Sequence, residues 1–257
     1  PITGTDFAGV VESVGAEVTK FKPGDRVFGF NDEGLRTHAE FVAVADKEAV
    51  ARIPDGISFE NAVASIEGAH YAYNFITKVK FERGDRVLLN GATGAIGSAA
   101  VQFLNHLGLE VTAVCGTEGL EVVRSWKPKR VIDFRTTDFA RELAGEKFRF
   151  VFDAVGKSSF GACRPLLEKR GIYISSELGP RAENPWLAMI TPFLGGRKVV
   201  FPIPVKIQRS MEFIAPLLVS GTFRPLIERT YRPEEIAEAF RHAGSGKKLG
   251  NVLVSWT

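Results

Sequence analysis

The stretch that most constrains the fold of this chain runs from Gly84 to Cys115, GDRVLLNGATGAIGSAAVQFLNHLGLEVTAVC. Residues 86–90 surround an unbroken Val-Leu-Leu run, which is typical of a parallel strand that is buried on both faces. A glycine-rich turn, a helix over about 95–107 and a second strand over 110–115 follow. This is the order of elements in a dinucleotide-binding βαβ unit.

The turn carries the small residues that such a unit needs. Ala92, Gly94 and Gly97 occupy the three spaced positions of a G-x-G-x-x-G fingerprint, with alanine at the first. Small residues there allow a tight turn, bring backbone N–H groups up to a pyrophosphate and let the helix pack on the sheet. The N-terminus of that helix also favours a phosphate. The turn therefore predicts nucleotide binding; the alternative is that its small residues serve packing alone.

The bulk composition narrows the class of protein. The chain has 257 residues, of which 45% are hydrophobic, so it can bury a large core in one or two domains. A net charge of +3 implies no nucleic-acid or acidic-membrane partner. Cys115 and Cys163 are too few for a disulfide framework or a four-cysteine zinc lobe, and a reducing compartment is expected. We find no run long enough for a membrane span and no signal peptide, and the start at Pro1, inside a strand entry, suggests a fragment.

Residues 1–57 are expected to form a small β-rich unit with short strands at Phe7–Val14, Arg26–Phe30 and Ala39–Val44. Strands this close together, with no helix between them, cannot be parallel crossovers and indicate an antiparallel barrel or sandwich. Ser58, with Asn61 in an approximate capping box, then begins a helix that continues towards Phe75.

From Arg86 onwards, predicted strands and helices alternate. The strands are 86–90, 110–115, 130–133, 149–153, 171–176 and 198–202, and the helices lie near 95–107, 119–126, 137–144, 158–168, 185–194 and 206–220. Six strands, each followed by a helix, predict a doubly wound parallel sheet. A strand at 226–231, a helix at 233–243 and a strand at 249–256 close the chain, and we expect them to rejoin the first domain.

Several motifs together resemble one family. They are Gly4–Val11 with Val14-Gly15, Phe21–Val27, Ala39–Phe41, Ile53–Gly56, Asn90–Gly97, Val131–Asp133, Asp153–Gly156 and Lys247–Val254. The chain thus resembles, over its whole length, the zinc-independent branch of the medium-chain dehydrogenase/reductase superfamily, the quinone oxidoreductases related to zeta-crystallin. The resemblance implies an α/β fold with a doubly wound parallel Rossmann sheet and a GroES-like β-rich domain, here N-terminally truncated, with the active site in the cleft. The predicted domains are a GroES-like domain, 1–60 with 223–257, and a Rossmann domain, 61–222.

Zinc is not expected. Zinc-dependent relatives carry Gly-His-Glu where this chain has Gly4-Thr5-Asp6, and threonine is a poor zinc ligand. The histidines, His38, His70, His106 and His242, form no close His/Cys cluster in the sequence.

The cofactor is predicted to be NADPH in preference to NADH. An NAD-preferring site places an acid at the end of the second strand, and that strand here ends Val114-Cys115-Gly116-Thr117. Thr117 could donate to a 2′-phosphate, and Arg135 could supply positive charge, as the resemblance suggests. Glu118 argues against this because a carboxylate repels a phosphate. In the alternative, Glu118 points to solvent and Arg135 pairs with Asp138.

The remaining site residues follow from topology and from the resemblance. The predicted cofactor-binding residues are Asn90, Ala92, Thr93, Gly94, Ala95, Ile96, Gly97, Gly116, Thr117, Arg135, Ala154, Val155, Gly156, Ser175, Ser176, Leu178 and Asn251. Without zinc, hydrogen-bond donors must support the developing negative charge, and Thr5, Asp6 and Tyr71 are the predicted catalytic residues. The alternative for Tyr71 is a helix-packing aromatic.

These observations predict an NADPH-dependent oxidoreductase that transfers a hydride to a quinone or α,β-unsaturated carbonyl. Two alternatives stay open: an enoyl-thioester reductase with a basic entrance formed by Arg197, Lys198, Lys206 and Arg209, and a non-catalytic NADPH-binding structural or scaffold protein. The apolar segment 184–195 is either a core helix or a pocket flap with an interface patch. We expect a cytoplasmic protein, with an organelle as the alternative. The resemblance implies a homodimer, because the family often pairs subunits through the sixth strand.

Overall fold

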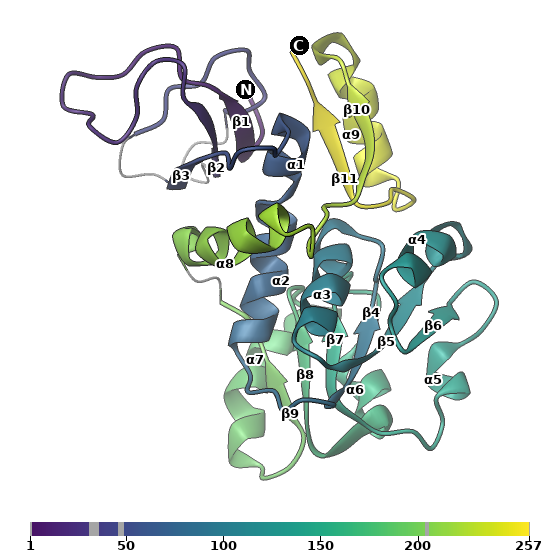
Figure 1. Ribbon diagram of the computed structural model, residues 1–257. Helices are drawn as coiled ribbons and strands as arrows, with labels where there is room; N and C mark the ends of the chain where they lie inside the picture. The colour runs from purple at the N-terminus through teal and green to yellow at the C-terminus, as the bar shows by residue number, and fades with distance from the viewer. Residues whose placement is uncertain (1, 31–35, 46–48, 204–205, 257) are drawn as a thin grey trace. The chain divides into compact units, whose positions relative to one another are not determined.

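The computed structural model describes residues 2–30, 36–45, 49–203 and 206–256 (Figure 1). The chain divides into two compact units. The split unit consists of Pro1–His70 and Val205–Thr257, and the central unit consists of Tyr71–Pro204. The division falls inside helix α2 (Glu67–Thr77).

The split unit begins with a three-stranded antiparallel sheet in the order β1 (Asp6–Val10), β2 (Arg26–Phe30) and β3 (Ala49–Arg52). The antiparallel pairing predicted for this region is confirmed. Helix α1 (Phe59–Ala64) follows, and Ser58 caps it by accepting a hydrogen bond from the Asn61 N–H at 3.2 Å.

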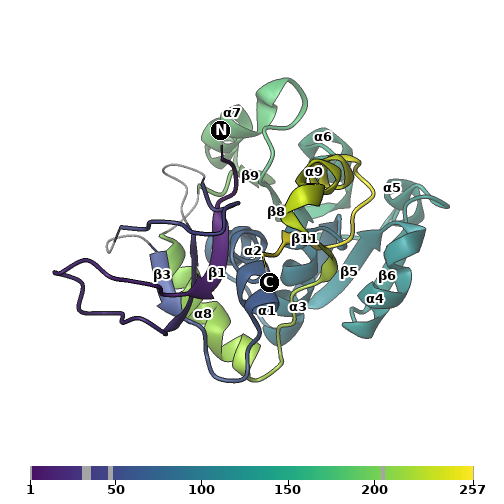
Figure 2. The same ribbon diagram turned by 90° about the horizontal axis from the view of Figure 1, so that it is seen from above.

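One apolar cluster holds these elements together. It joins the sheet and α1 to the start of α2 and to α8 (Ile207–Val219), through Phe28, Ala49, Ile53, Ala62, Ile66 and Met211. The C-terminal part adds a βαβ turn: β10 (Ile227–Tyr231) and β11 (Asn251–Val254) pair in parallel, and α9 (Ile236–Gly244) packs beside β11 (Figures 1 and 2). The predicted domain bounds, which place residues 206–222 with the Rossmann domain, stay a prediction.

The central unit is built on a six-stranded sheet whose neighbouring strands are all parallel. Across the sheet, the strands are β6 (Arg130–Asp133), β5 (Glu110–Cys115), β4 (Arg86–Asn90), β7 (Phe148–Asp153), β8 (Leu167–Ser175) and β9 (Lys198–Val200). In chain order, this is 3-2-1-4-5-6, the order of a dinucleotide-binding doubly wound sheet, so the predicted fold class is confirmed. The order reverses between β4 and β7, and ligands of such sheets bind beyond the carboxyl ends of the strands at that point.

Helices cover this sheet. Helix α3 (Ala95–His106) packs on β4 and β5, α4 (Leu120–Ser125) on β5 and β6, α6 (Phe160–Cys163) on β8, and α7 (Glu183–Ile190) on β9, while α5 (Phe139–Glu142) follows β6. Residues Gly97–Leu104 of α3 are all buried, which matches an apolar helix in the middle of the unit. The strands contribute a cluster of fully buried large side chains that includes Leu88, Phe148, Val151 and Tyr173.

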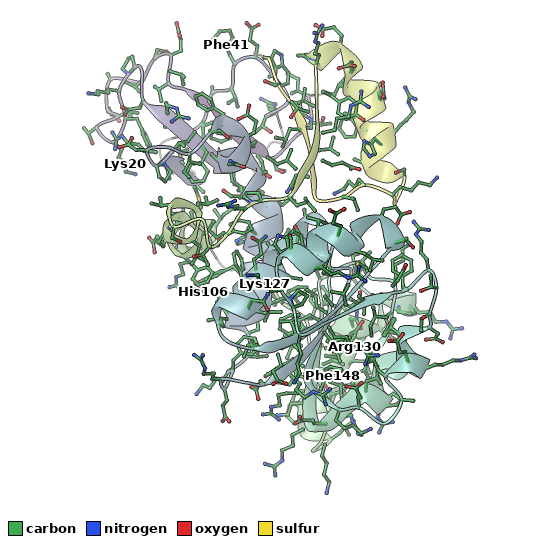
Figure 3. All side chains as sticks on the ribbon, turned by 45° about the vertical axis from the view of Figure 1, so that its right-hand side comes forward. Lys20, Phe41, His106, Lys127, Arg130 and Phe148 are labelled. Atoms are coloured by element: carbon green, nitrogen blue, oxygen red, sulfur yellow. The ribbon has the colours of Figure 1, made fainter. Side chains whose placement is uncertain are left out.

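The amino-terminal ends of the strands carry ion pairs instead of a site. Arg130, at the start of β6, binds Glu146 with an N–O distance of 2.9 Å and also binds Glu142, and Arg86, at the start of β4, binds Glu146. Arg86 also lies over the Phe148 ring, 4.7 Å from its centroid. Figure 3 labels Arg130 and Phe148 in this part of the central unit. Exposed pairs of this kind stabilise the fold only modestly.

Two expectations about the β-rich region are wrong. The predicted strand Ala39–Val44 forms no ladder with the described residues, because β2 already has a partner on each side and Phe41 is exposed. The third strand is instead Ala49–Arg52, and the predicted strand Phe7–Val14 ends at Val10. Residues 31–34, where the sequence pattern predicts the break between the strands at 26–30 and 39–44, lie outside the described residues.

The helix predicted towards Phe75 is interrupted: α1 ends at Ala64, and α2 begins at Glu67. Most of the other helices are shorter than predicted. Strand β8 starts four residues earlier than expected, at Leu167. Within the described ranges, no helix is both long and apolar enough to cross a bilayer.

Candidate dinucleotide-binding site

The glycine-rich turn connects β4 to α3 and is tighter than the fingerprint alone suggests. The residue that turns the chain is Gly91, whose φ of +86° is unfavourable for other residues. A Cβ on Gly97 would lie 2.0 Å from the Gly91 carbonyl oxygen, so the first turn of α3 touches the backbone of the turn. A Cβ on Gly94 would meet its nearest neighbour only at 3.9 Å. Gly91 is not among the predicted site residues, although a glycine directly after the strand that ends at Asn90 indicates a tight turn.

The N-terminus of α3 presents backbone donors at this turn. Gly94 is the N-cap, and no side chain among the described residues caps the helix. The Gly91 and Ala92 N–H groups bond to the Val114 carbonyl, at 3.1 and 2.9 Å, whereas the N–H groups of residues 95–97 belong to the first helical turn, which has no intrahelical acceptor. Such a turn is suited to a phosphate. Predicted residues 92–97 therefore lie together in one loop-to-helix junction.

The predicted loop Ala154–Gly156 follows β7 and reaches the same turn. A Cβ on Gly91 would lie 2.8 Å from the Val155 Cβ, so Val155 packs directly against the turn. The loop is held by Asp153, which is fully buried and accepts hydrogen bonds from the Val155 and Gly156 N–H groups at 3.3 and 3.0 Å. Predicted Asn90 donates to the same carboxylate at 3.1 Å. Asp153 belongs to the Asp153–Gly156 motif of the resemblance, but it is not among the predicted site residues.

Three more predicted residues, Ser175, Ser176 and Leu178, lie at the end of β8 and in the loop that follows it. Ser175 is buried and accepts from the Glu177 N–H at 3.2 Å, and Leu178 is exposed. The Ser176 hydroxyl is buried and has no hydrogen-bond partner among the described residues. A buried, unpaired hydroxyl costs free energy, so it marks this loop as a place where a ligand acceptor or donor would be stabilising.

The predicted 2′-phosphate residues are engaged by carboxylates. The Thr117 hydroxyl donates to Asp133 at 2.6 Å, and Arg135 binds Glu118 through two contacts of 2.8 and 3.0 Å. The pKa of Asp133 is lowered, mainly by the Thr117 hydrogen bond, and the pKa of Glu118 is lowered by hydrogen bonds from its own backbone and from Arg135. The alternative pairing of Arg135 with Asp138 is wrong.

Asp138 pairs with Arg141 instead, at 3.5 Å. Gly116 lies against the Glu118 carboxylate, since a Cβ there would come within 2.8 Å of it.

The split unit places Thr5 and Asp6 beside a second acid, Glu67. The Thr5 hydroxyl lies 3.5 Å from the Glu67 carboxylate, and Asp6 accepts a bond from the Glu67 N–H at 3.3 Å. The other Asp6 carboxylate oxygen is buried without a partner in the described part of the chain. Burial, reinforced by the Glu67 charge, raises the pKa of Asp6 well above 3.8, and burial raises the pKa of Glu67. Asp6 therefore holds its proton to a higher pH than an exposed aspartate does.

The remaining two predicted residues lie elsewhere. Tyr71 lies on α2, one helical turn after Glu67. Asn251 begins β11 and donates its side-chain amide to the Leu226 carbonyl at 2.9 Å, which gives it a local structural role. The structure leaves their predicted functions as predictions.

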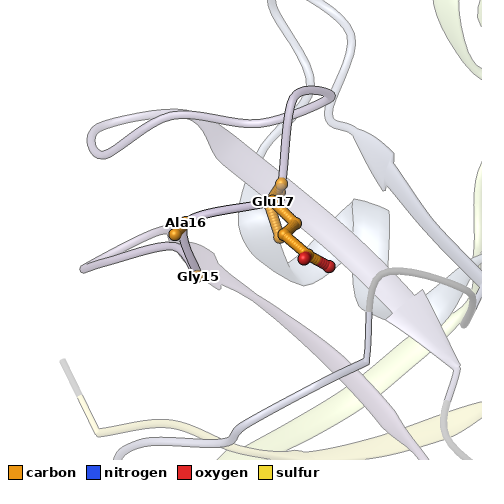
Figure 4. A pocket seen from close by; sticks show the side chains of 4 residues that line it. Gly15, Ala16 and Glu17 are labelled. Carbon is orange, nitrogen blue, oxygen red and sulfur yellow. The ribbon is translucent and has the colours of Figure 1, made fainter.

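The expected absence of zinc stays a prediction. Among the described residues, no three His, Cys, Asp or Glu side chains lie close enough together to hold a metal ion. Thr5 engages Glu67, and His38 bonds to the Thr3 hydroxyl at 2.9 Å. A shallow hollow lined by Gly15, Ala16, Glu17 and Val18 contains none of the predicted site residues (Figure 4).

Comparison with known proteins identifies the family. The alcohol dehydrogenase GroES-like domain matches residues 1–69, and the zinc-binding dehydrogenase domain matches residues 128–254. The chain belongs to the medium-chain dehydrogenase/reductase superfamily. Within it, the similarities place the chain in the quinone oxidoreductase branch.

Three similar proteins illustrate this placement. A quinone oxidoreductase from Pseudomonas aeruginosa is 27% identical over 98% of this chain and 81% of its own length. A mycocerosic acid synthase-like polyketide synthase from Mycolicibacterium smegmatis is 31% identical over 99% of this chain, which spans only 12% of that much longer protein. The crystal structure of Escherichia coli quinone oxidoreductase complexed with NADPH has the same fold, with a TM-score of 0.84 at 23% identity over 98% of this chain and 81% of that one.

Proposed function

We propose that this superfamily member is an NADPH-dependent reductase that transfers a hydride to a quinone or α,β-unsaturated carbonyl without zinc. The observation that carries the proposal is the turn between β4 and α3, where Gly91 and Gly97 make close backbone packing possible and the uncapped helix presents N–H groups. The P. aeruginosa relative, a quinone oxidoreductase, supports the acceptor class.

The cofactor, when bound, supplies the hydride, and the residues of the chain position it. We assign the diphosphate to the backbone N–H groups of residues 95–97 and the nicotinamide half to the loops at 154–156 and 175–178. Thr5, Asp6 and Tyr71 are proposed to donate hydrogen bonds to the acceptor oxygen as negative charge develops on it. Asp6 suits this task because its raised pKa keeps its proton available.

The preference for NADPH depends on Arg135. Its guanidinium is the predicted source of positive charge for the 2′-phosphate, and it must leave Glu118 to bind that phosphate. NADH is the second candidate, favoured by the two carboxylates, Asp133 and Glu118, which could accept the ribose hydroxyls.

The test is oxidation of NADPH and NADH by the protein against quinones, enones and acyl thioesters, with Gly94→Ala as the binding-deficient control. The proposal expects turnover with a quinone or an enone. Turnover restricted to acyl thioesters would favour the enoyl-thioester reductase, which the polyketide synthase relative supports. The four basic residues predicted for the entrance of such a reductase are divided between the two units. Arg197 and Lys198 belong to the central unit, and Lys206 and Arg209 belong to the split unit. Tight NADPH binding without any turnover would favour the scaffold alternative.

We also propose that a second copy of the chain covers the edge of the central sheet. Strand β9 is an edge strand, and beside it Trp186, Met189 and Phe193 are 64%, 64% and 88% exposed at helical spacing. An apolar stripe next to a strand that has a free edge among the described strands is suited to a symmetric partner that continues the sheet. Light scattering should find a dimer that Phe193→Asp converts to a monomer, and a wild-type monomer would contradict the proposal.

A further inference from the structure

Asp153 is a buried carboxylate whose partners carry no charge. It is fully buried at the end of β7, and among the described residues it makes no ion pair. It accepts five hydrogen bonds of 3.0–3.3 Å, from the Asn90 amide, the Tyr173 hydroxyl and the N–H groups of Val155, Gly156 and Ser158. Burying an ionised carboxylate is costly unless several donors compensate it, so these five contacts act together.

The donors come from two strands, β4 and β8, and from one loop. Asn90 ends β4, Asp153 ends β7, and Tyr173 lies in β8, so the carboxylate joins the carboxyl ends of strands on both sides of the point where the strand order reverses. The three N–H donors belong to the loop that follows β7. Burial and the Asp153 charge raise the pKa of Tyr173, so its hydroxyl stays a donor.

The loop after β7 connects Asp153 to the glycine-rich turn through Val155. Oδ1 of Asp153 accepts from the Val155 N–H, and the Val155 side chain lies against Gly91, closer than a Cβ on Gly91 could tolerate. On the far side of the loop, Glu177 packs against Gly156, where a Cβ would come within 2.4 Å of the Glu177 Cγ. The position of the carboxylate therefore determines where Val155 stands and how closely Gly91 is packed.

Building on the proposed function, we propose that Asp153 is a positioning residue of the cofactor site, which holds Val155 against Gly91 and so fixes the phosphate-binding turn. It acts through the loop and does not touch the nucleotide. An aspartate is required there because Oδ1 accepts three of these hydrogen bonds and Oδ2 accepts two, whereas an asparagine would replace one of the two oxygens with N–H donors.

The experiment compares Asp153→Asn with Tyr173→Phe. Tyr173→Phe removes one donor from the same carboxylate but leaves all three loop N–H bonds and Asn90 in place. Calorimetry gives the melting temperature, and fluorescence titration with NADPH, well below that temperature, gives Kd. We expect Asp153→Asn to raise Kd about tenfold or more and Tyr173→Phe to lower the melting temperature with Kd within about threefold of wild type. Wild-type Kd in Asp153→Asn, or equal loss of affinity in both variants, would overturn the proposal.

Val155→Ala provides a second route that does not depend on the folding of Asp153→Asn. Val155 is 42% exposed, so the shorter side chain costs little stability, and its loss of contact with Gly91 should still weaken NADPH binding severalfold. Because both substitutions act on one chain of contacts, the effect of the double variant on Kd should be smaller than the product of the single effects. An unchanged Kd in Val155→Ala, or independent effects in the double variant, would contradict the link.

Different binding results would refute the proposed function and the role of Asp153. Absence of NADPH and NADH binding by the wild-type protein would refute the proposed function. Wild-type binding that Asp153→Asn and Val155→Ala leave intact would refute only the role of Asp153.

Discussion

A comparison of Gly97→Ala with Gly94→Ala should separate the effect of packing in the glycine-rich turn from the effect on phosphate binding. The added Cβ would lie 2.0 Å from the Gly91 carbonyl oxygen, 2.8 Å from its carbon and 3.0 Å from the Ala92 Cα, all of them backbone atoms. No side-chain rotation relieves these contacts, so α3 must move away from the turn. Overpacking of this kind costs about 1–3 kcal/mol, which corresponds to a loss of about 2–12 °C in melting temperature for a domain of this size.

Gly94→Ala is the matched substitution. Its φ of −69° suits alanine, and the new Cβ would meet its nearest neighbour at 3.9 Å, so the loss of stability should stay below about 1 kcal/mol. If a diphosphate sits at this helix N-terminus, the same methyl group occupies its space, and Kd for NADPH should rise about tenfold or more. Calorimetry and titration of both variants measure the two effects. A Gly94→Ala protein with unchanged stability and unchanged affinity would refute the assignment of the phosphate site.

Three further predictions follow from charges and burial. Glu118→Gln should release Arg135 and raise the affinity for NADPH relative to NADH about three- to tenfold, and an unchanged ratio in paired titrations would contradict this. Because folding raises the pKa of Asp6 above 3.8, the folded protein keeps a proton that the unfolded chain releases. The free energy of unfolding should therefore fall as pH rises from about 4. Urea unfolding of Asp6→Asn at several pH values should show a smaller decline than wild type. Burial raises the pKa of the Cys115 and Cys163 thiols to about 11, so a thiol reagent at about pH 8 should label both only after denaturation, and rapid labelling of the folded protein would contradict it.

Local sequence patterns predicted most of the central unit. The bounds of β4, β5 and β6 were predicted to the residue because each is an apolar run between turn residues, and such a run is stable in only one place in a parallel sheet. The glycine-rich turn was located correctly for the same local reason, since a short strand-to-helix connection requires small residues. The break between Ala64 and Glu67 in the predicted helix was not foreseen.

The pairings that make up the candidate site needed the tertiary structure. Ala39–Val44 has the composition of a strand, but a strand exists only where another strand offers hydrogen bonds, and none of the described strands does so there. Arg135 could be assigned to Asp138 from proximity in the sequence, whereas the structure brings it to Glu118, 17 residues away. Asp153 is one acid among many in the sequence. It becomes the centre of five hydrogen bonds only because parallel strands bring Asn90 and Tyr173, distant in the chain, to the same end of one sheet.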